Sequence, residues 1–276
     1  MRHDIVSKNK RGLSMVGIRI FSYLPNPRIY KSTIAGRLCG VKVELIGAKP
    51  RELQDWLWDF QARPLNDGDK QDESLVRRGR TGFTGTVLYK TDAFLQAHPF
   101  GTVPAAFSPD GNVGIFESNS IMRAVARLGE DETGLYGDDP YSMSRVDSFL
   151  DASLVFARDS QIYMLALANQ TLTKEIYKRA SSAFDGYLTG INRALSGGDT
   201  FILGEKLTLA DICFCCEYAL FMREGKRTKT LSDLGLSPIV NSKIKSTFPF
   251  AIEHFTKLSE HEAFAPDLER FLEEET

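Results

Sequence analysis

An acid followed directly by a serine, Glu117–Ser118, stands where a short apolar run gives way to a helical pattern. The serine hydroxyl and the first N–H groups of such a helix can bind a carboxylate. The carboxylate of the neighbouring glutamate can accept a hydrogen bond from an ammonium group. The pair therefore fits one end of an amino acid. The alternative is structural: a capping serine beside an acid that the helix dipole favours.

A second candidate site is the dipeptide Val103–Pro104, which precedes a predicted strand. Proline cannot donate to a sheet, so at the first residue of a strand it marks an edge or a special turn. If the peptide bond is cis, the backbone of the preceding residue turns outward and can pair with an extended peptide. The alternative is a trans proline at the end of a loop.

Metal and hydrolytic chemistry lack the residue spacing that they need. The cysteines are too few and too clustered for a disulfide framework, and no histidine lies near the group at 213–216. The histidines do not suggest a hydrolytic triad, and no phosphate-binding loop is present. We therefore predict no metal site.

The elements that position these residues begin after a predicted flexible extension, residues 1–16. The alternation in Ile18–Ser22 predicts a strand. Asn26 and Pro27 then supply a cap and a first helical residue, and Gly40 ends the helix. Residues 41–46 predict a second strand. The order strand, helix, strand is a βαβ unit.

An insertion near residues 48–86 interrupts this order and combines two tryptophans with three arginines, Arg77, Arg78 and Arg80. Such a cluster could bind nucleic acid. The net charge of −2 argues against this. We therefore predict that the insertion is a surface loop that covers an apolar patch.

A Gly-, Asp- and Pro-rich stretch between Gly129 and Pro140 predicts a domain boundary. Helical spacing dominates beyond it. We therefore expect an α/β domain over 17–130 and an all-helical domain over 138–276. Apolar runs are too short to span a membrane, and the basic, polar N-terminus lacks the apolar core of a secretory signal. These features predict a cytoplasmic protein.

Three segments in this order resemble the cytosolic glutathione transferases: His98-Pro-Phe-Gly-Thr-Val-Pro104, Phe116-Glu-Ser-Asn-Ser-Ile121 and Leu207-Thr-Leu-Ala-Asp211. The first two are especially similar to the transferase-like region of the elongation factor 1B gamma subunit. The resemblance covers roughly residues 17–265. It implies a thioredoxin-like α/β N-terminal domain followed by an all-α helical bundle.

The resemblance also implies a glutathione site. The Val103 backbone would pair with the cysteinyl unit, with a cis bond before Pro104. Glu117 and Ser118 would hold the γ-glutamyl end, and Thr102 stands where the family often contacts the glycyl carboxylate.

The residue that activates the thiol lies just after the first strand in this family. The candidates here are Ser22, Tyr23 and Asn26, and the absence of a cysteine there argues against thiol exchange. We favour Ser22 over Asn26 as the catalytic residue, because Tyr23 would point the opposite way along the strand. The predicted acceptor pocket is lined by Tyr23 and by three residues of the helical domain, Tyr141, Phe149 and Phe156.

The function implied is an enzyme that uses glutathione as co-substrate and attacks a small hydrophobic electrophile, in detoxification or aromatic-compound metabolism. Cleavage of lignin-type β-aryl ethers fits this chemistry. The expected assembly is a homodimer, or a heterodimer with a related chain, without nucleic acid or membrane. The alternatives are a noncatalytic interaction module of the elongation factor 1B gamma type and nucleic-acid binding through the arginine cluster.

Overall fold

The computed structural model describes residues 17–80, 82–129 and 134–275. The predicted extension at 1–16 lies outside this range. The first half is built on a four-stranded sheet in the order β2-β1-β7-β8, in which β1 and β2 are parallel and the other neighbours are antiparallel. Its strands are β1 (Ile18–Tyr23), β2 (Val43–Ala48), β7 (Ala105–Phe107) and β8 (Gly114–Phe116).

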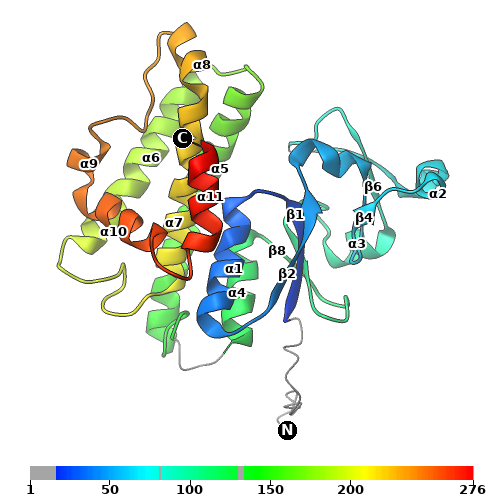
Figure 1. Ribbon diagram of the computed structural model, residues 1–276, viewed down its shortest axis with the longest axis horizontal. Helices are drawn as coiled ribbons and strands as arrows, with labels where there is room; N and C mark the ends of the chain where they lie inside the picture. The colour runs from blue at the N-terminus through cyan, green and yellow to red at the C-terminus, as the bar shows by residue number, and fades with distance from the viewer. Residues whose placement is uncertain (1–16, 81, 130–133, 276) are drawn as a thin grey trace.

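Two helices, α1 (Pro27–Cys39) and α4 (Ser118–Leu128), lie between this sheet and the helical half of the molecule (Figure 1). The predicted start and end of α1 are confirmed. The Asn26 side chain accepts from the backbone N–H of Arg28, and Gly40 ends the helix with φ 73°. A left-handed residue at this point is the usual position for glycine.

The predicted surface loop after β2 is wrong, because the insertion folds into a second four-stranded sheet in the order β4-β3-β6-β5. Trp58 is 1% exposed, donates from Nε1 to the Leu53 carbonyl at 2.9 Å and packs edge-on against Phe94. The insertion therefore carries its own apolar core. Its elements are η1 (Pro50–Asp55), β3 (Trp56–Trp58), β4 (Arg63–Pro64), α2 (Asp67–Gln71), η2 (Glu73–Leu75), β5 (Val76–Arg78) and β6 (Val87–Lys90), followed by α3 (Asp92–Ala97).

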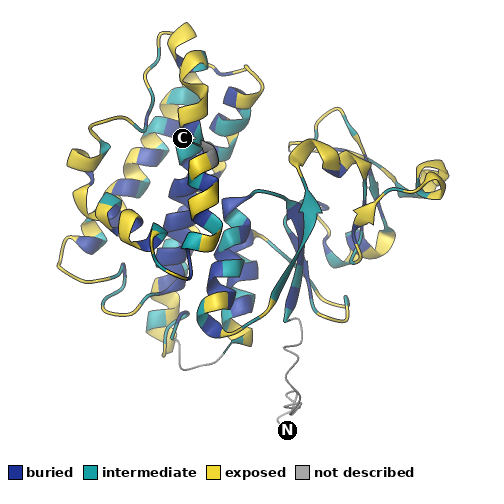
Figure 2. Ribbon diagram, in the orientation of Figure 1, coloured by how far each residue is buried: buried dark blue, intermediate teal, exposed yellow. Residues whose placement is uncertain are grey.

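The second half is helical, as predicted, so the fold class is confirmed: a small α/β domain joined to a helical bundle. Helix α7 runs through the centre of the bundle and every one of its residues is buried (Figure 2). No helix within the described ranges is long and apolar enough to cross a membrane. The helices are α5 (Pro140–Ala168), α6 (Lys174–Leu195), α7 (Leu209–Phe221), η4 (Met222–Arg227), α8 (Thr228–Asp233), α9 (Ile244–Thr247), α10 (Pro249–Ser259) and α11 (Ala265–Glu275).

Candidate functional site

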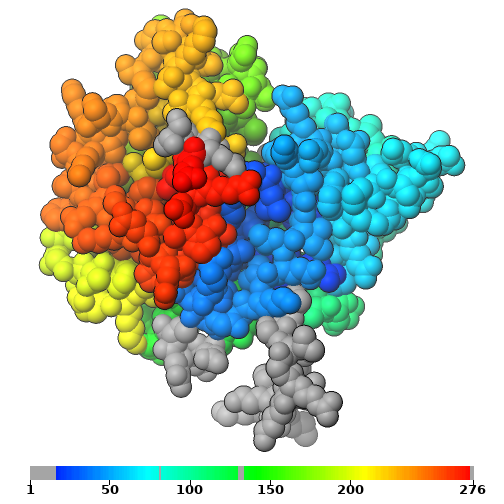
Figure 3. Space-filling view, in the orientation of Figure 1, coloured from blue at the N-terminus to red at the C-terminus, as the bar shows by residue number. Residues whose placement is uncertain are grey.

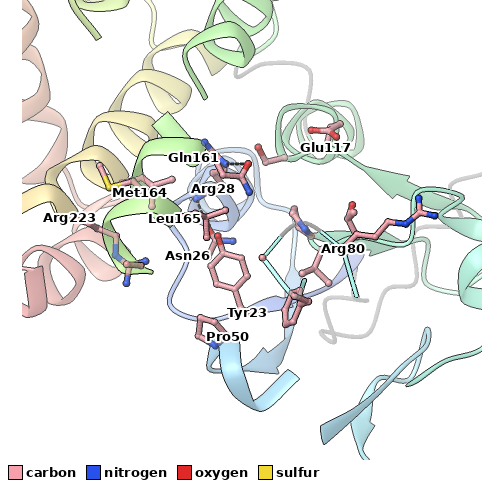
Figure 4. A pocket seen from close by; sticks show the side chains of 18 of the residues that line it. Tyr23, Asn26, Arg28, Pro50, Arg80, Glu117, Gln161, Met164, Leu165 and Arg223 are labelled. Atoms are coloured by element: carbon pink, nitrogen blue, oxygen red, sulfur yellow. Dashed lines mark hydrogen bonds between the residues drawn. The ribbon is translucent and has the colours of Figure 1, made fainter. Parts of the chain in front are cut away.

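A cavity of about 530 Å³ lies where the α/β half, the inserted sheet and the helical half meet. This volume is typical of small-molecule sites. Figure 3 shows the two halves of the molecule that flank it, and Figure 4 shows the cavity from close by. The predicted residues Thr102, Val103, Pro104, Glu117 and Ser118 all line it.

One wall of the cavity is the backbone before Pro104, and the Val103–Pro104 peptide bond is cis. Strand β7 begins only at Ala105. Among the described residues, no backbone hydrogen bond engages the N–H or C=O of Val103. These two groups are therefore available to an extended ligand. Thr102 also lines the cavity, with its hydroxyl 3.4 Å from His98 Nε2.

The N-terminus of α4 forms a second wall, where Glu117 and Ser118 lie side by side. Glu117 has φ 65°, a left-handed conformation that non-glycine residues rarely adopt and that tends to occur at functional sites. Ser118 is the first residue of this 11-residue helix. The free N–H groups of the first turn and the serine hydroxyl favour an anion.

A buried cluster of charges lies directly beneath Ser118. Lys31 Nζ is 3.4 Å from the Ser118 hydroxyl, 2.8 Å from Asn119 Oδ1 and 2.7 Å from Glu217 Oε1. Arg28 Nε donates to the same Glu217 carboxylate at 3.1 Å. Burial alone would raise the pKa of Glu217, but the two cations lower it to about 2. Two cations thus share one ionised carboxylate, and the excess positive charge favours an anion at the start of α4.

Sequence reasoning missed Lys31 and Glu217. The available signal was Glu217 itself, because it stands on a helix that is almost wholly apolar. A buried acid needs a cation or hydrogen-bond donors. A basic partner on another element could therefore have been expected.

The structure corrects the preference for Ser22 as the thiol-activating residue. Ser22 and Asn26 are both 1% exposed, but only Asn26 is among the residues that line the cavity. The Ser22 hydroxyl accepts from Asn26 Nδ2 at 3.4 Å, so Ser22 lies behind Asn26. Asn26 and Tyr23 do line the cavity, and both are visible in Figure 4. Burial raises the pKa of Tyr23, despite the nearby Arg28, so its hydroxyl stays protonated and can donate.

The predicted acceptor pocket is also corrected: of its four residues only Tyr23 lines this cavity. Tyr141 is 89% exposed, Phe149 lies under Arg145, and Phe156 is stacked on Tyr187 in the helical core. The physical reason is the length of α5, which has 29 residues and is roughly 43 Å long at 1.5 Å per residue. Only its C-terminal part reaches the cavity, through Gln161, Met164, Leu165 and Ala168.

The arginines of the insertion do not act as one group. Arg77 pairs with Asp92 at 2.7 Å, whereas Arg80 lines the cavity. Lys90 lines it too; its ammonium donates to the Gly101 carbonyl and lies 4.3 Å from the centre of the Trp58 ring. Burial and the nearby arginines lower the pKa of Lys90 to about 8.

Metal ligands do not gather in the part of the chain that the structure describes, where no group of three His, Cys, Asp or Glu side chains could hold an ion. Cys213, Cys215 and Cys216 lie in the buried helix α7, and burial raises the pKa of all three thiols.

No family model matches this chain. Curated proteins that are similar to it include elongation factor 1-gamma proteins. It is 29% identical over 175 residues to probable elongation factor 1-gamma 1 of Arabidopsis thaliana, a match that covers 61% of this chain and 37% of that protein. It is 29% identical over 232 residues to elongation factor 1-gamma 1 of Oryza sativa subsp. japonica, a match that covers 83% of this chain and 43% of that protein. The chain thus spans about two fifths of the length of these relatives.

Solved structures that are similar to it include glutathione transferases. Isozyme E7 from Drosophila melanogaster superposes with a TM-score of 0.62 at 16% identity, covering 93% of each chain. A glutathione S-transferase from Methylobacterium radiotolerans, in complex with glutathione sulfonate, superposes with a TM-score of 0.59 at 16% identity. The match covers 92% of this chain and 95% of that one. The chain therefore has the glutathione transferase fold and resembles the elongation factor 1-gamma proteins in sequence.

Proposed function

We propose that this chain is a glutathione transferase. The observation that carries the proposal is the meeting of three features in one cavity: the unused backbone of Val103 before a cis proline, the Glu117–Ser118 pair at the start of α4, and Asn26 at the start of α1. Each feature alone has a structural explanation. Together they match the peptide backbone, the amino-acid end and the thiol of glutathione.

The binding mode follows from charge. The γ-glutamyl ammonium pairs with Glu117, and its carboxylate accepts from Ser118 and the first N–H groups of α4, with the Lys31 ammonium behind them. The N–H and C=O of Val103 pair with the cysteinyl backbone. The thiol then lies toward Asn26 and Tyr23, across the cavity from Glu117 in Figure 4.

The chemistry follows from the donors at the start of α1. The oxygen of the Asn26 amide is used by the helix cap, and one amide hydrogen points to Ser22. Its second hydrogen, and the Tyr23 hydroxyl, are available to a thiolate. Donors to the charged form lower the pKa of a thiol, so the nucleophile exists at neutral pH.

In the reaction the thiolate sulfur forms a bond to an electrophilic carbon, and the bond from that carbon to its leaving group breaks. The leaving group departs with the electron pair, and the thiol proton has passed to solvent. Substitution of an aryl halide and cleavage of an aryl ether are both reactions of this form. The proposal includes the cytoplasmic role in detoxification or aromatic-compound metabolism that the resemblance implies.

A second candidate is a noncatalytic module that docks a partner in a protein complex. The specific observation in its favour is the sequence similarity to elongation factor 1-gamma proteins. In this case the chain would pair with a related chain, and the cavity would support no turnover.

The test is the formation of the thioether from glutathione and 1-chloro-2,4-dinitrobenzene, followed by absorbance. The wild type should exceed the uncatalysed rate, and Glu117→Gln should raise the KM for glutathione roughly tenfold because the ammonium loses a charged partner. Glu253→Gln, on the exposed face of α10, is the control. If the folded protein yields no thioether above the uncatalysed rate with this or other aryl and epoxide electrophiles, the module is the better account.

A further inference from the structure

The charged side chains that line the cavity are mostly positive. Glu117 is the single acid in this lining, against six basic residues: Arg28, Arg80, Lys90, Arg223, Lys226 and Arg227. Arg28 shares the Glu217 carboxylate with Lys31. Lys90, Arg80 and Arg227 form no ion pair within the described ranges. The cavity therefore holds more positive charge than Glu117 offsets, even without Arg223 and Lys226.

Part of this charge lies away from the glutathione end. Arg223, Lys226 and Arg227 come from the short helix η4 of the helical half. Figure 4 shows Arg223 and Glu117 on opposite sides of Tyr23 and Asn26. A glutathione that binds Glu117 and presents its thiol at Asn26 leaves the η4 side of the cavity for the second substrate.

The same side of the cavity has an apolar wall. Met164, Leu165 and Ala168 from the end of α5 and Leu220 from the end of α7 line it. Apolar surface with a few charged groups is the usual design of a site that fixes both the body and the orientation of a small ligand.

The acid within η4 does not neutralise these cations. Glu224 is fully buried and accepts from the Tyr163 hydroxyl at 2.5 Å and from the backbone N–H groups of Ile239 and Val240 at 2.9 and 2.8 Å. It is therefore committed to the interior. The basic residues on either side of it line the cavity.

We propose that the second substrate is an apolar molecule that carries an anionic group, of which a carboxylate is the simplest, and that Arg227 binds this group beside Arg223 and Lys226. The inference rests on the proposed function and narrows it from a hydrophobic electrophile to an anionic one. The guanidinium fork of arginine matches the two oxygens of a carboxylate. The electrophilic carbon faces Asn26, so the anionic group lies at the other end of the substrate.

The test compares two unreactive probes of closely similar shape, the neutral 3-nitrobenzamide and the anionic 3-nitrobenzoate, by quenching of tryptophan fluorescence, since Trp58 lines the cavity. The wild type should bind the benzoate about tenfold more tightly. The ratio of the affinity for the benzoate to that for the neutral probe should fall toward one in Arg227→Gln. It should also fall in about 0.5 M NaCl, because salt screens the charges. Arg193→Gln, an exposed arginine on α6, is the matched control and should keep the preference.

A reactive pair extends the test to turnover. 4-Chloro-3-nitrobenzoate should be a better substrate than 4-chloro-3-nitrobenzamide when each rate is divided by its uncatalysed rate with glutathione, and Arg227→Gln should remove the advantage.

Equal binding of the two probes by the wild type overturns the inference, and so does a preference that survives in Arg227→Gln. A preference that is then lost in Lys90→Gln would place the anion at the inserted sheet. A parallel titration with glutathione separates the two proposals. Saturable glutathione binding without an anion preference contradicts this inference alone. An absence of glutathione binding contradicts the proposed function and, with it, the assignment of a second substrate.

Discussion

Asn26 is the residue on which the proposed chemistry depends, because it has two structural contacts and also faces the cavity. Its side-chain oxygen caps α1, and its amide nitrogen donates to Ser22. These contacts hold the amide in one orientation. A donor fixed in advance stabilises a developing thiolate without reorganisation.

Asn26→Asp should keep the capping oxygen but remove the amide donors and add a negative charge. A hydrogen bond to a charged group contributes roughly 1.5–3 kcal/mol, so kcat/KM at neutral pH should fall about 10- to 100-fold. The pKa of the bound thiol should rise, and the pH profile of kcat/KM should move to higher pH. The measurement is kcat/KM for the electrophile against pH with saturating glutathione, so that the profile reports the bound thiol.

Asn66→Asp is the matched control, since Asn66 caps the distant helix α2 through the same type of contact. Its profile should equal that of the wild type. An unchanged profile in Asn26→Asp would exclude Asn26 as the donor and leave Tyr23 as the candidate in the cavity.

The sequence predicts some of these residues better than others, for physical reasons. Val103–Pro104 and Glu117–Ser118 are local signals that two adjacent residues carry, and the structure brings them to one cavity. Ser22 lies behind Asn26 and does not line the cavity. The sequence could not predict this, because alternation along a strand separates its two faces but does not say which face is covered by α1. Tyr141 was predicted to line the acceptor pocket, but it lies at the start of the long helix α5, and only the end of this helix reaches the cavity.

At the scale of elements, the charge cluster joins the two halves of the molecule. Lys31 and Arg28 lie on α1 and Glu217 lies on α7, and all three take part in buried ion pairs. Removing one partner from such a cluster leaves uncompensated buried charge, which is far more costly than losing a surface pair.

Glu217→Gln should lower the free energy of unfolding by about 3–5 kcal/mol at pH 7, because two cations lose their carboxylate. The pKa of Glu217 is about 2 in the folded protein, against 4.5 as the ordinary value. A carboxyl whose pKa is lower in the folded than in the unfolded protein stabilises the fold at pH values above its unfolded pKa. This stabilisation is lost as the pH falls toward the folded pKa. The gap between wild type and variant should therefore be constant above about pH 5.5 and narrow below about 4.5.

Urea unfolding from pH 7 to pH 4 measures this gap. Glu253→Gln, which breaks an exposed pair with Lys257, is the control and should leave stability essentially unchanged. A Glu217→Gln protein as stable as the wild type at pH 7, or a gap independent of pH, would contradict the account of the cluster.

The inserted sheet is the element that sequence patterns could not predict. Its strands are two to four residues long, too short for alternation to show. Its pairing also depends on contacts between β3 and β6, which lie far apart in the sequence. The signal that was present is the aromatic content, since Trp58 and Phe94 both belong to its buried core.

Trp58→Ala should lower the free energy of unfolding by about 3–5 kcal/mol, because it empties the centre of this small core. Far-ultraviolet circular dichroism during denaturant unfolding is the appropriate measurement, since the change removes a fluorophore. Phe250→Ala removes an aromatic side chain that is 44% exposed and should cost much less. Equal effects of the two substitutions would mean that the inserted sheet adds little to stability.

For the molecule as a whole, the overall composition does not show that positive charge is concentrated around the cavity. The net charge of −2 suggests no preference for anions. The fold nevertheless gathers six basic residues from α1, the insertion and η4 around one cavity. This convergence is tertiary, so composition and spacing could not predict it, whereas the order of the three motifs predicted the fold itself.

In the proposed function, this cavity binds glutathione with its γ-glutamyl end at the start of α4. Calorimetric titration of the folded protein with glutathione tests it most directly, beside Ser118→Ala and the control Ser120→Ala from the same helix. We predict saturable binding at one site, about tenfold weaker in Ser118→Ala because a hydrogen bond to a carboxylate is lost, and unchanged in Ser120→Ala. No binding by the folded wild type, or equal affinity in Ser118→Ala, would contradict it.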